Sequence, residues 1–491
     1  MSAFSPSVIL DRVTKLATPA RPIYLIGGVL RDRLLGLTSR DIDFAMREDS
    51  IQAARQVADE YGGDFYVLDA ERGIARVLLR GESQSHLVLD FADMRAETIE
   101  ADLALRDFSI NAMASDLLHP QDIIDPLNAR QDISSRTLRM CAQTCFEDDP
   151  VRILRAVRFG VQLGFAIEPA SEEKLREAIP LLNTPSVERQ RDELFNILEG
   201  RGVSQAAQQL EKFGVLPGLL PEVAALVGFK QSSHHLHDAW QHTSAVLTYF
   251  EQIVDSFLAD PSAGSRHPLI ASAIDRLIRY KSVIHVYLKE QVNSLRSLRS
   301  LLLFAALLHD VGKPAARQET ADGTVTYIGH EDTGAELARG RAVALALSND
   351  EVQTVAGFIR NHMRIHLMSK DENLDLRRAV YQFFLASGWV GVADCLFSLA
   401  DLLATYEDQM DPQRWEQGLS MCEKLLDAWF NHHKEWISPP LLLNGDDLQK
   451  ELHLKPGALI GDLLRKLEEA QAVGEVTTRR EALNYLKSCL A

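Results

Sequence analysis

Short apolar runs rich in β-branched residues alternate with amphipathic stretches in the first quarter of the chain. Between Pro22 and Asp125 these runs read IYLIG, DIDFAM, DFYVLD, ARVLLR and HLVLDFA. Runs of this length and composition are typical of strands, and the segments between them have the apolar spacing that predicts helices. The pattern therefore predicts an α/β domain in this part of the chain.

From about Thr137 onward, strand-like runs nearly disappear, and leucine and alanine recur at helical spacing. The segments ILRAVRFGVQLGF and VERQRDELFNILEG are examples. Apolar residues every three or four positions predict amphipathic helices, so we expect the remainder to be all-α. The predicted fold class for the whole chain is α+β, with an α/β head followed by helices.

At 491 residues the chain is longer than one hydrophobic core usually serves. We expect four parts along it. They are a head at 1–135, a neck at 136–200, a body at 201–410 and a helical tail at 411–491.

The hydrophobic pattern predicts neither a membrane span nor a secretory signal. The longest apolar run, Leu301 to Leu308, is far shorter than the roughly 18 residues of a membrane helix and is expected to form a buried helix. In the segment Met1 to Leu16, charged residues such as Asp11 and Lys15 interrupt the apolar positions, unlike a signal peptide. We therefore expect the protein to stay in the cytoplasm.

The charge balance limits how the protein meets nucleic acid. With 52 Lys and Arg against 69 Asp and Glu, the net charge is −17, which argues against a chain coated in RNA. Any RNA must be bound locally, and one stretch is rich in arginine. Its members are Arg136, Arg139, Arg152, Arg155 and Arg158. Such a cluster forms either a solvated helix face or a surface that binds anions.

A glycine pair marks the first candidate binding feature. The segment IYLIGGVLRDRLLG predicts a strand, a turn at Gly27 and Gly28, and a helix beginning near Val29. Glycines let the backbone approach a ligand closely, and a helix N-terminus offers unpaired N–H groups to phosphate. The same pattern also fits an ordinary tight connection, so its meaning depends on the residues around it.

Two aspartates follow the glycine pair. Asp41 and Asp43, in DIDFAM, are one residue apart on a predicted strand and should point to the same face. Paired carboxylates suit a hard cation such as Mg²⁺, and paired ions activate a hydroxyl and stabilise charge on phosphoryl oxygens. Asp90, in HLVLDFA, ends a strand expected beside this one. It is either a third carboxylate, acting as base or metal support, or the cap of a turn.

Four motifs resemble those of the class II CCA-adding tRNA nucleotidyltransferases and bacterial poly(A) polymerases, members of the DNA polymerase β superfamily. GGVLRD with DIDF is similar to the first motif, and DLALRDFSINAMA (Asp102 to Ala114) to the second, with Leu105 where an arginine often stands. DDPVRILRAVRF (Asp148 to Phe159) resembles the E-D-x-x-R motif with Asp148 in place of glutamate, and ERQRDELFNIL (Glu188 to Leu198) resembles the neck helix. The resemblance covers nearly the whole chain.

This resemblance implies template-independent addition of CMP and AMP to the 3′ end of tRNA from CTP and ATP. It implies a two-metal mechanism at Asp41 and Asp43, with Asp90 as a further catalytic carboxylate. The residues implied in nucleotide binding are Gly27, Gly28, Arg31, Asp32, Arg106, Asp149, Arg152, Arg155 and Arg158. Asp149 and Arg152, three apart on a predicted helix, would present an acceptor and donors to one base, and the other arginines would hold the triphosphate.

A second candidate site lies in the all-α part. LLFAALLHDVGKP places His309 and Asp310 at the end of a predicted buried helix, a costly position for polar groups unless they bind something. The order of candidate ligands is similar to that of the HD superfamily of metal-dependent phosphohydrolases. The ligands in that order are His242, His309, Asp310 and Asp401, with His330 and His362 where the superfamily often has further histidines.

Imidazole and carboxylate mixtures suit Mn²⁺, Ni²⁺, Zn²⁺ or Fe²⁺ better than Mg²⁺, so we expect a transition metal at this second site. The resemblance implies phosphatase or cyclic phosphodiesterase activity. A purely structural HD fold is the alternative.

Three alternatives for the whole protein stay open. The stretch from Asp90 to Asp102, where the family has a flexible loop that helps switch from C to A addition, looks short, so a CC-only or A-only enzyme fits as well. A poly(A) polymerase shares the head motifs, but an acidic chain without a basic extension disfavours it. An HD phosphohydrolase with an RNA-binding head is disfavoured by the intact pair Asp41 and Asp43.

Overall fold

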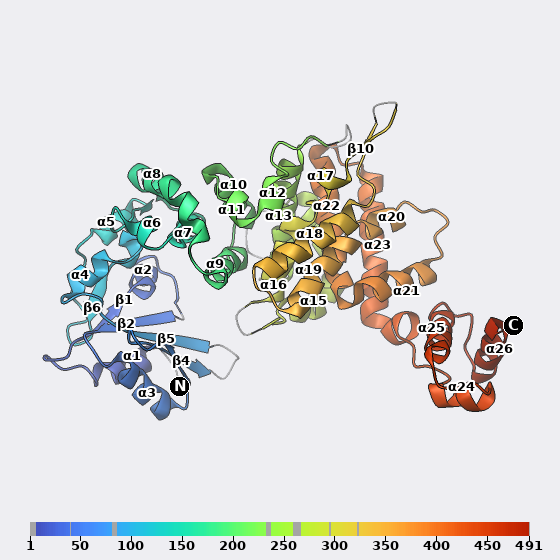
Figure 1. The fold of residues 1–491 in the computed structure, drawn as a ribbon, viewed down its shortest axis with the longest axis horizontal. Coiled ribbons are helices and arrows are strands. Elements are labelled where there is room, and N and C mark those ends of the chain that lie inside the picture. The colour runs from blue at the N-terminus through green and yellow to red at the C-terminus, as the bar shows by residue number, and fades with distance from the viewer. Residues whose placement is uncertain are drawn as a thin grey trace. The chain divides into compact units, whose positions relative to one another are not determined.

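The computed structural model describes residues 6–39, 41–80, 86–231, 237–258, 267–293, 296–321 and 324–490. The chain forms two compact units, Met1–Ser186 and Val187–Ala491, whose elements are labelled in Figure 1. The finer division into four parts stays a prediction.

A seven-stranded sheet lies at the centre of the first unit. Its strand order is β3-β4-β5-β2-β1-β6-β7; β2 and β5 pair in parallel, and the other neighbouring pairs are antiparallel. The strands are β1 (Ile23–Ile26), β2 (Asp41–Met46), β3 (Asp64–Asp69), β4 (Ile74–Arg80), β5 (His86–Asp93), β6 (Ala114–Asp116) and β7 (Ile123–Ile124). The predicted α/β head is confirmed.

The two parallel strands separate an apolar face from a polar one. Phe44 of β2 and Phe91 of β5 occupy the same register position, and their buried rings stack with centroids 4.8 Å apart. Because successive residues of a strand face opposite sides, Asp43 and Asp90 project from the other face. The apolar packing of the strands therefore fixes where these carboxylates point.

Helices complete the first unit. They are α1 (Pro6–Thr14), α2 (Gly28–Leu34), α3 (Ser50–Tyr61), α4 (Ile99–Ala104), α5 (Ala129–Ser134), α6 (Cys145–Asp148), α7 (Arg152–Leu163) and α8 (Pro169–Ala178), with 3₁₀ turns at Ser109–Asn111 and Ile179–Asn183. The short strands β8 (Thr137–Leu138) and β9 (Ala166–Ile167) form a second, parallel pair. Helix α7 buries Ile153, Leu154 and Val157, and this apolar stripe holds its arginines at fixed positions.

The second unit is helical in its described residues apart from a hairpin of β10 (Gln318–Glu319) and β11 (Val325–Thr326). The first helices are α9 (Val187–Glu199), α10 (Val203–Phe213), α11 (Leu216–Leu219), α12 (Pro221–Ala224), α13 (Ala239–Leu258), α14 (Pro268–Arg276), α15 (Lys281–Leu288), α16 (Leu298–Leu308) and α17 (Lys313–Ala316). They continue with α18 (His330–Ala344), α19 (Asn349–Asn361), α20 (Arg364–Met368), α21 (Leu376–Ser387), α22 (Gly391–Tyr406), α23 (Pro412–Asn431), α24 (Gly445–Glu451), α25 (Ala458–Ala472) and α26 (Arg479–Leu490).

Four helices, α13, α16, α19 and α22, pack against one another around an aromatic centre. The rings of Phe250, Phe358 and Phe397 contact each other with centroid distances of 4.8 to 6.2 Å. Helix α16 is entirely buried, as predicted for Leu301 to Leu308. These rigid helices carry the second candidate site.

One helical stretch, Leu376–Gln409, is long and apolar enough to cross a membrane by length and composition alone. Since 78% of its most apolar window is buried inside the protein, it has the character of a core helix. The last three helices, α24 to α26, share a separate apolar cluster that includes Leu448, Leu467 and Leu486.

Candidate functional site

Three carboxylates gather on the polar face of β2 and β5. Asp41 and Asp43 alternate along β2 as predicted, and Asp43 is the register partner of Asp90. Burial, followed by repulsion from Asp90, raises the pKa of Asp43 to about 6, and the same two causes raise the pKa of Asp41. Crowded carboxylates of this kind are stabilised by a bound cation, and their oxygens suit a hard one.

Asp90 lies in the middle of β5 rather than at its end. Its carboxylate is held by Arg76 of β4, whose Nε and Nη2 each donate a hydrogen bond of 2.8 Å to it. Arg76 was not predicted from the sequence as a partner of Asp90, because only the register of β4 against β5 brings the two side chains together. The bidentate contact fixes Asp90 beside the other two carboxylates.

The turn between β1 and α2 closes directly on this carboxylate group. Gly27 has a φ of +75°, and a Cβ at this position would lie 2.9 Å from Oδ2 of Asp43. Any other residue would therefore be strained and would push against Asp43. The helix begins at Gly28, close to the predicted start.

Arg106 is also close to the turn. A Cβ on Gly27 would be 3.6 Å from Nη1 of Arg106, whose Nη2 is 3.5 Å from Asp102. The Nε of Arg106 is buried without a hydrogen-bond partner in the described part of the chain. Its positive charge lowers the pKa of Asp43, opposing the larger effect of burial. Arg106 is thus a buried donor beside the carboxylates.

A polar network connects three of the predicted motifs of the first unit. Arg31 donates to Asn111 at 2.7 Å and to Asp32 at 2.7 and 2.9 Å. Asn111 in turn donates to Asp107 at 3.2 Å, and Arg155 of α7 donates to Asp107 at 2.8 and 2.6 Å. Three segments far apart in the sequence are therefore held in one arrangement.

Asp107 is the buried centre of that network. Burial alone would raise its pKa, but the adjacent Arg155 and the hydrogen bonds that Asp107 accepts hold the pKa at about 2. Asp107 therefore stays ionised and fixes the position of Arg155. The same arginine is near enough to Asp43 to lower the pKa of that carboxyl.

The residues predicted to select the base lie at the start of α7. Nε of Arg152 is 4.0 Å from Asp149, while its Nη1 and Nη2 donate to the carbonyls of Cys145 (3.2 Å) and Leu105 (3.0 Å). The prediction that both residues stand on one helix is wrong for Asp149, which is extended and precedes Pro150. Arg158, on the same helix, lies with its guanidinium 4.3 Å from the ring centre of Phe159.

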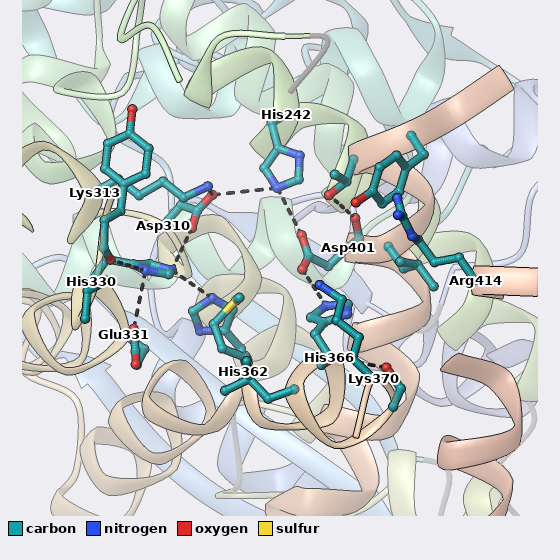
Figure 2. A pocket seen from close by; sticks show the side chains of 18 of the residues that line it. His242, Asp310, Lys313, His330, Glu331, His362, His366, Lys370, Asp401 and Arg414 are labelled. Carbon is teal, nitrogen blue, oxygen red and sulfur yellow. Dashed lines mark hydrogen bonds and ion pairs between the residues drawn. The ribbon is translucent and has the colours of Figure 1, made fainter. Parts of the chain in front are cut away.

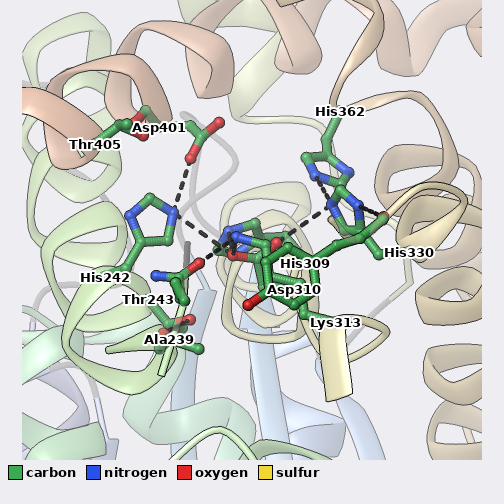
Figure 3. Close-up of polar contacts among 12 residues, drawn as sticks. Ala239, His242, Thr243, His309, Asp310, Lys313, His330, His362, Asp401 and Thr405 are labelled. Atoms are coloured by element: carbon green, nitrogen blue, oxygen red, sulfur yellow. Dashed lines mark hydrogen bonds and ion pairs between the residues drawn. The ribbon is translucent and has the colours of Figure 1, made fainter. Parts of the chain in front are cut away.

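The second candidate site brings together the four predicted ligands in the other unit (Figure 3). Nε2 of His242, on α13, is 3.0 Å from Asp401 of α22 and 3.6 Å from Oδ2 of Asp310. His309 directly follows α16, and its Nε2 is 3.1 Å from the same Asp310 oxygen. All four side chains are buried.

The two further histidines lie on the opposite side of Asp310. Nε2 of His330 is 3.5 Å from Oδ1 of Asp310 and 3.3 Å from Nε2 of His362. Two groups of three ligand atoms therefore share Asp310: one with His242 and His309, the other with His330 and His362, each with all atoms within 4.8 Å. The shared carboxylate can bridge two neighbouring cations.

Backbone carbonyls orient three of these imidazoles. Nδ1 of His309, His330 and His362 lies 2.8, 2.9 and 2.6 Å from the carbonyl oxygens of Ala306, Tyr327 and Ile359. Since a carbonyl only accepts hydrogen bonds, each Nδ1 carries a proton, which leaves Nε2 as the atom that can bind a metal. This is the arrangement by which proteins prepare histidine as a metal ligand.

The charges of the site fit a metal as well. Burial alone would raise the pKa of Asp310, but His309 and Lys313 hold it well below its usual range. Burial lowers the pKa of His362 to about 3, so that imidazole is neutral. Nζ of Lys313 lies 2.7 Å from Oδ2 of Asp310, yet neither that oxygen nor Nε2 of His309 has a hydrogen bond of good geometry among the described residues. A divalent transition metal would satisfy both atoms.

Two residues near these ligands were not identified from the sequence. Nζ of Lys313 is 2.7 Å from Asp310, and Nε2 of His366 is 2.8 Å from the second oxygen of Asp401. Lys313 is the lysine of HDVGK, so its distance of three residues from Asp310 was available as a signal. His366 depends on the position of α20 beside α22, which the sequence pattern does not give.

The candidate metal ligands lie in the wall of a pocket of about 660 Å³ (Figure 2). Among its lining residues are His242, Asp310, His330, His362 and Asp401. The pocket continues beyond them to Tyr327 on one side and to Tyr406 and Arg414 on the other. It is large enough for a small-molecule ligand rather than a metal ion alone.

Comparison with known protein families gives three matches. Residues 23–139 match the poly(A) polymerase head domain, residues 164–226 match a probable RNA- and SrmB-binding site of polymerase A, and residues 283–405 match the HD domain. His242 lies outside the HD match, although the structure places it against the other ligands.

Two relatives are similar over nearly their whole length. The A-adding tRNA nucleotidyltransferase of Deinococcus radiodurans is 32% identical over 474 residues, which are 94% of each chain. The CC-adding tRNA nucleotidyltransferase of Geobacter sulfurreducens is 30% identical over 465 residues, 94% of this chain and 91% of the relative. A solved complex of a CCA-adding enzyme with ATP has a TM-score of 0.61 at 20% identity, covering 99% of this chain and 97% of that one, so the fold is shared.

Proposed function

The chain belongs to the tRNA nucleotidyltransferases that carry a poly(A) polymerase head domain, and on this premise we propose that it adds CMP and AMP to the 3′ end of tRNA from CTP and ATP. One observation carries the proposal. Asp41, Asp43 and Asp90 stand together on one face of two strands, and the turn at Gly27 passes so close to Asp43 that a Cβ there would be 2.9 Å from its carboxylate.

We assign Mg²⁺ to Asp41 and Asp43, because carboxylate oxygens are the ligands it prefers. When bound there, the ions lower the pKa of the attacking 3′-hydroxyl and offset charge on the phosphoryl oxygens. Asp90 supports this group as the third carboxylate. The two hydrogen bonds from Arg76 keep its oxygens beside Asp43.

The arginines of the head would hold the triphosphate. A phosphate oxygen next to Gly27 would lie near Nη1 of Arg106, which is 3.6 Å from a Cβ placed at that glycine. Arg155 is fixed by Asp107, and Arg31 by Asp32 and Asn111, so both are preorganised and lose little freedom when nucleotide binds. Arg158 extends the same row along α7.

Asp149 and Arg152 are proposed to recognise the base. Two backbone carbonyls hold the Arg152 guanidinium, and the extended Asp149 lies within 4.0 Å of it. The carboxylate offers acceptors and the guanidinium offers donors, which suits the mixed edges of cytosine and adenine. Recognition by side chains in place of a template strand requires such a fixed pair.

The two relatives are named for A addition and for CC addition, so the experiment has to identify which nucleotides this chain adds. Three tRNA substrates, ending before CCA, after C and after CC, are incubated separately with CTP, ATP or both. Extension of all three to CCA supports the proposal. Extension of only the CC-ended tRNA by ATP would show an A-adding enzyme, and a stop after CC would show a CC-adding one.

We further propose a phosphohydrolase activity in the HD domain, with a transition metal held by His242, His309, Asp310 and Asp401. The oriented Nε2 atoms and their closeness to the buried carboxylate of Asp310 support it. His330 and His362 would hold a second ion through the other oxygen of Asp310. Metal analysis of the purified protein, together with phosphate release from phosphate monoesters and 2′,3′-cyclic phosphates, tests this activity. Both reactions are proposed to take place in the cytoplasm.

A further inference from the structure

The HD pocket contains a second cationic region that the metal ligands do not account for. Lys370 follows α20, and Arg414 lies in the first turn of α23; both line the pocket. Figure 2 shows them on the Asp401 side of the pocket, whereas Lys313 lies next to Asp310. The pocket therefore has cations at two separate places.

The two cationic places differ in how their charge is compensated. Lys313 is neutralised by Asp310 and also donates to Gln231 at 2.6 Å. In the described part of the chain, neither Lys370 nor Arg414 forms a side-chain hydrogen bond or an ion pair. The guanidinium of Arg414 lies 4.2 Å from the ring centre of Tyr406, which holds it without neutralising it.

Two carboxylates share this end of the pocket, and Asp401 lies 3.0 Å from His242 and 2.8 Å from His366. Asp411 also lines it, but its oxygen accepts the backbone N–H of Gln413 and caps α23. Both carboxylates thus have other partners, whereas Lys370 and Arg414 have no ion-pair partner among the described residues, in a chain whose net charge is −17. Two neighbouring cations without ion-pair partners in the pocket favour an anionic ligand at that place.

The distance from the metal ligands indicates a second group of the substrate rather than the reacting one. Asp401 and Tyr406 are five positions apart on α22, or about 7.5 Å along the helix axis. The ring that Arg414 lies against is thus attached more than one helical turn beyond Asp401. This leaves room for a sugar between a phosphate at the histidines and another phosphate at Arg414.

Exposed apolar side chains in the same pocket suit a nucleobase. Leu367 is 63% exposed and Ile328 is 79% exposed, and both line the pocket with Tyr327 and Tyr406. Aromatic and apolar surfaces next to cations are the usual means of holding single-stranded nucleic acid. A lone phosphate would use neither these surfaces nor most of the 660 Å³.

We propose that Lys370 and Arg414 form an anion subsite through which the HD pocket prefers an oligonucleotide ending in a 3′-phosphate to a mononucleotide. This inference rests on the proposed phosphohydrolase function. In the reaction, the oxygen of water bonds to the terminal phosphorus and the bond from phosphorus to the 3′ oxygen breaks. The released 3′ oxygen takes a proton from the water, and the internal phosphodiester stays intact at the subsite.

The test compares two substrates on the full-length, metal-loaded protein. Uridine 3′-monophosphate carries one phosphate, and the dinucleotide UpUp carries an internal phosphodiester and a terminal 3′-phosphate. The wild type is expected to show a KM about tenfold lower for UpUp. Arg414→Gln and Lys370→Gln are each expected to reduce this preference severalfold, and Lys424→Gln, which removes the same charge from α23 outside this pocket, is expected to keep it.

A binding measurement separates the subsite from the chemistry. The dinucleotide UpU has the internal phosphodiester but no terminal phosphate, so calorimetric titration reports the subsite even if no hydrolysis occurs. Binding that Arg414→Gln weakens and Lys424→Gln does not would support the subsite. Equal binding by both variants, or an unchanged preference for UpUp in Arg414→Gln, would overturn it. Absence of hydrolysis in the wild type alone would contradict only the phosphohydrolase proposal.

Discussion

Asp43 and Asp90 occupy the same register position on the parallel strands β2 and β5, so two carboxylates 47 positions apart in sequence project from one face of the sheet. Burial, together with their closeness, raises the pKa of Asp43 to about 6. Without a bound cation, the ionised carboxylates therefore lower the free energy of unfolding, and this effect can be measured.

The first prediction concerns stability of the metal-free protein. A carboxyl whose folded pKa lies above its unfolded value stabilises the fold most below the unfolded pKa, and this contribution is lost as pH rises through the folded pKa. As pH rises from about 4 to about 6, ionisation of Asp43 should lower the free energy of unfolding of the metal-free wild type by at most roughly 3 kcal/mol. In EDTA, Asp43→Asn should unfold at a higher temperature than the wild type at pH 7, with the difference shrinking at pH 4. Equal midpoints at both pH values would argue against a crowded carboxylate site.

The second prediction concerns base selection. Asp149→Ala and Arg152→Ala should each lower the preference for CTP and ATP over UTP and GTP, because each removes one half of the pair that presents donors and acceptors to the base. Competition between labelled nucleotides on one tRNA measures the preference. Arg176→Ala, which removes a charge from a surface pair with Glu172, is the matched control and should keep wild-type selection.

Wild-type selection in both variants would mean that the base is recognised elsewhere.

The local structure around these two residues could be predicted from the sequence only in part. The motif of this segment identified Asp149 and Arg152, but both were predicted to lie on one helix. The residue before a proline is restricted to extended conformations, so Asp149-Pro150 already contained the signal that the helix begins later.

Other parts of the account could be predicted for clear physical reasons. Because Asp41 and Asp43 alternate with apolar neighbours, the sequence predicts that both lie on one face of a strand. His309 and Asp310 follow a helix that is predicted to be buried, where polar groups are costly unless they bind a ligand. Contacts between distant segments could not be predicted in this way. Arg76 reaches Asp90 because of strand register, and His366 reaches Asp401 because of helix packing, and neither leaves a periodic pattern in one sequence.

The third prediction concerns the buried pair of Asp107 and Arg155. Arg155→Met leaves the Asp107 carboxylate without its cation, and loss of one partner of a buried pair costs roughly 3 kcal/mol, less here because Arg155 is 34% exposed. Since the pKa of Asp107 is lowered to about 2, the stabilisation is present above about pH 4 and is lost as pH falls toward 2.

Urea unfolding at pH 7 and pH 3 measures this effect. The variant should be clearly less stable at pH 7 and closer to the wild type at pH 3, and Asp107→Asn combined with Arg155→Met should recover part of the loss. Arg176→Met, at an exposed pair, should change stability by less than about 1 kcal/mol. A loss in Arg155→Met that is the same at both pH values would contradict the ion-pair explanation.

The fourth prediction separates the two sites. His309→Ala with Asp310→Ala should abolish transition-metal binding and hydrolysis of phosphate esters, since Asp310 belongs to both groups of ligands. Nucleotide addition should persist, because the head motifs all lie in the other compact unit. Metal analysis and both assays on the same preparation check this, with circular dichroism as the control for folding. Loss of addition in a folded variant would mean that the sites are coupled.

The most direct test of the central proposal is incorporation of labelled CMP and AMP into tRNA that lacks CCA, with Mg²⁺, by the wild type and by Asp41→Asn with Asp43→Asn. The asparagines keep the shape of the side chains but remove the charge that would hold the ions. We predict extension by the wild type and a loss of at least about a thousandfold in the folded variant. Incorporation at a wild-type rate by that variant would contradict the assignment of the reaction to these carboxylates.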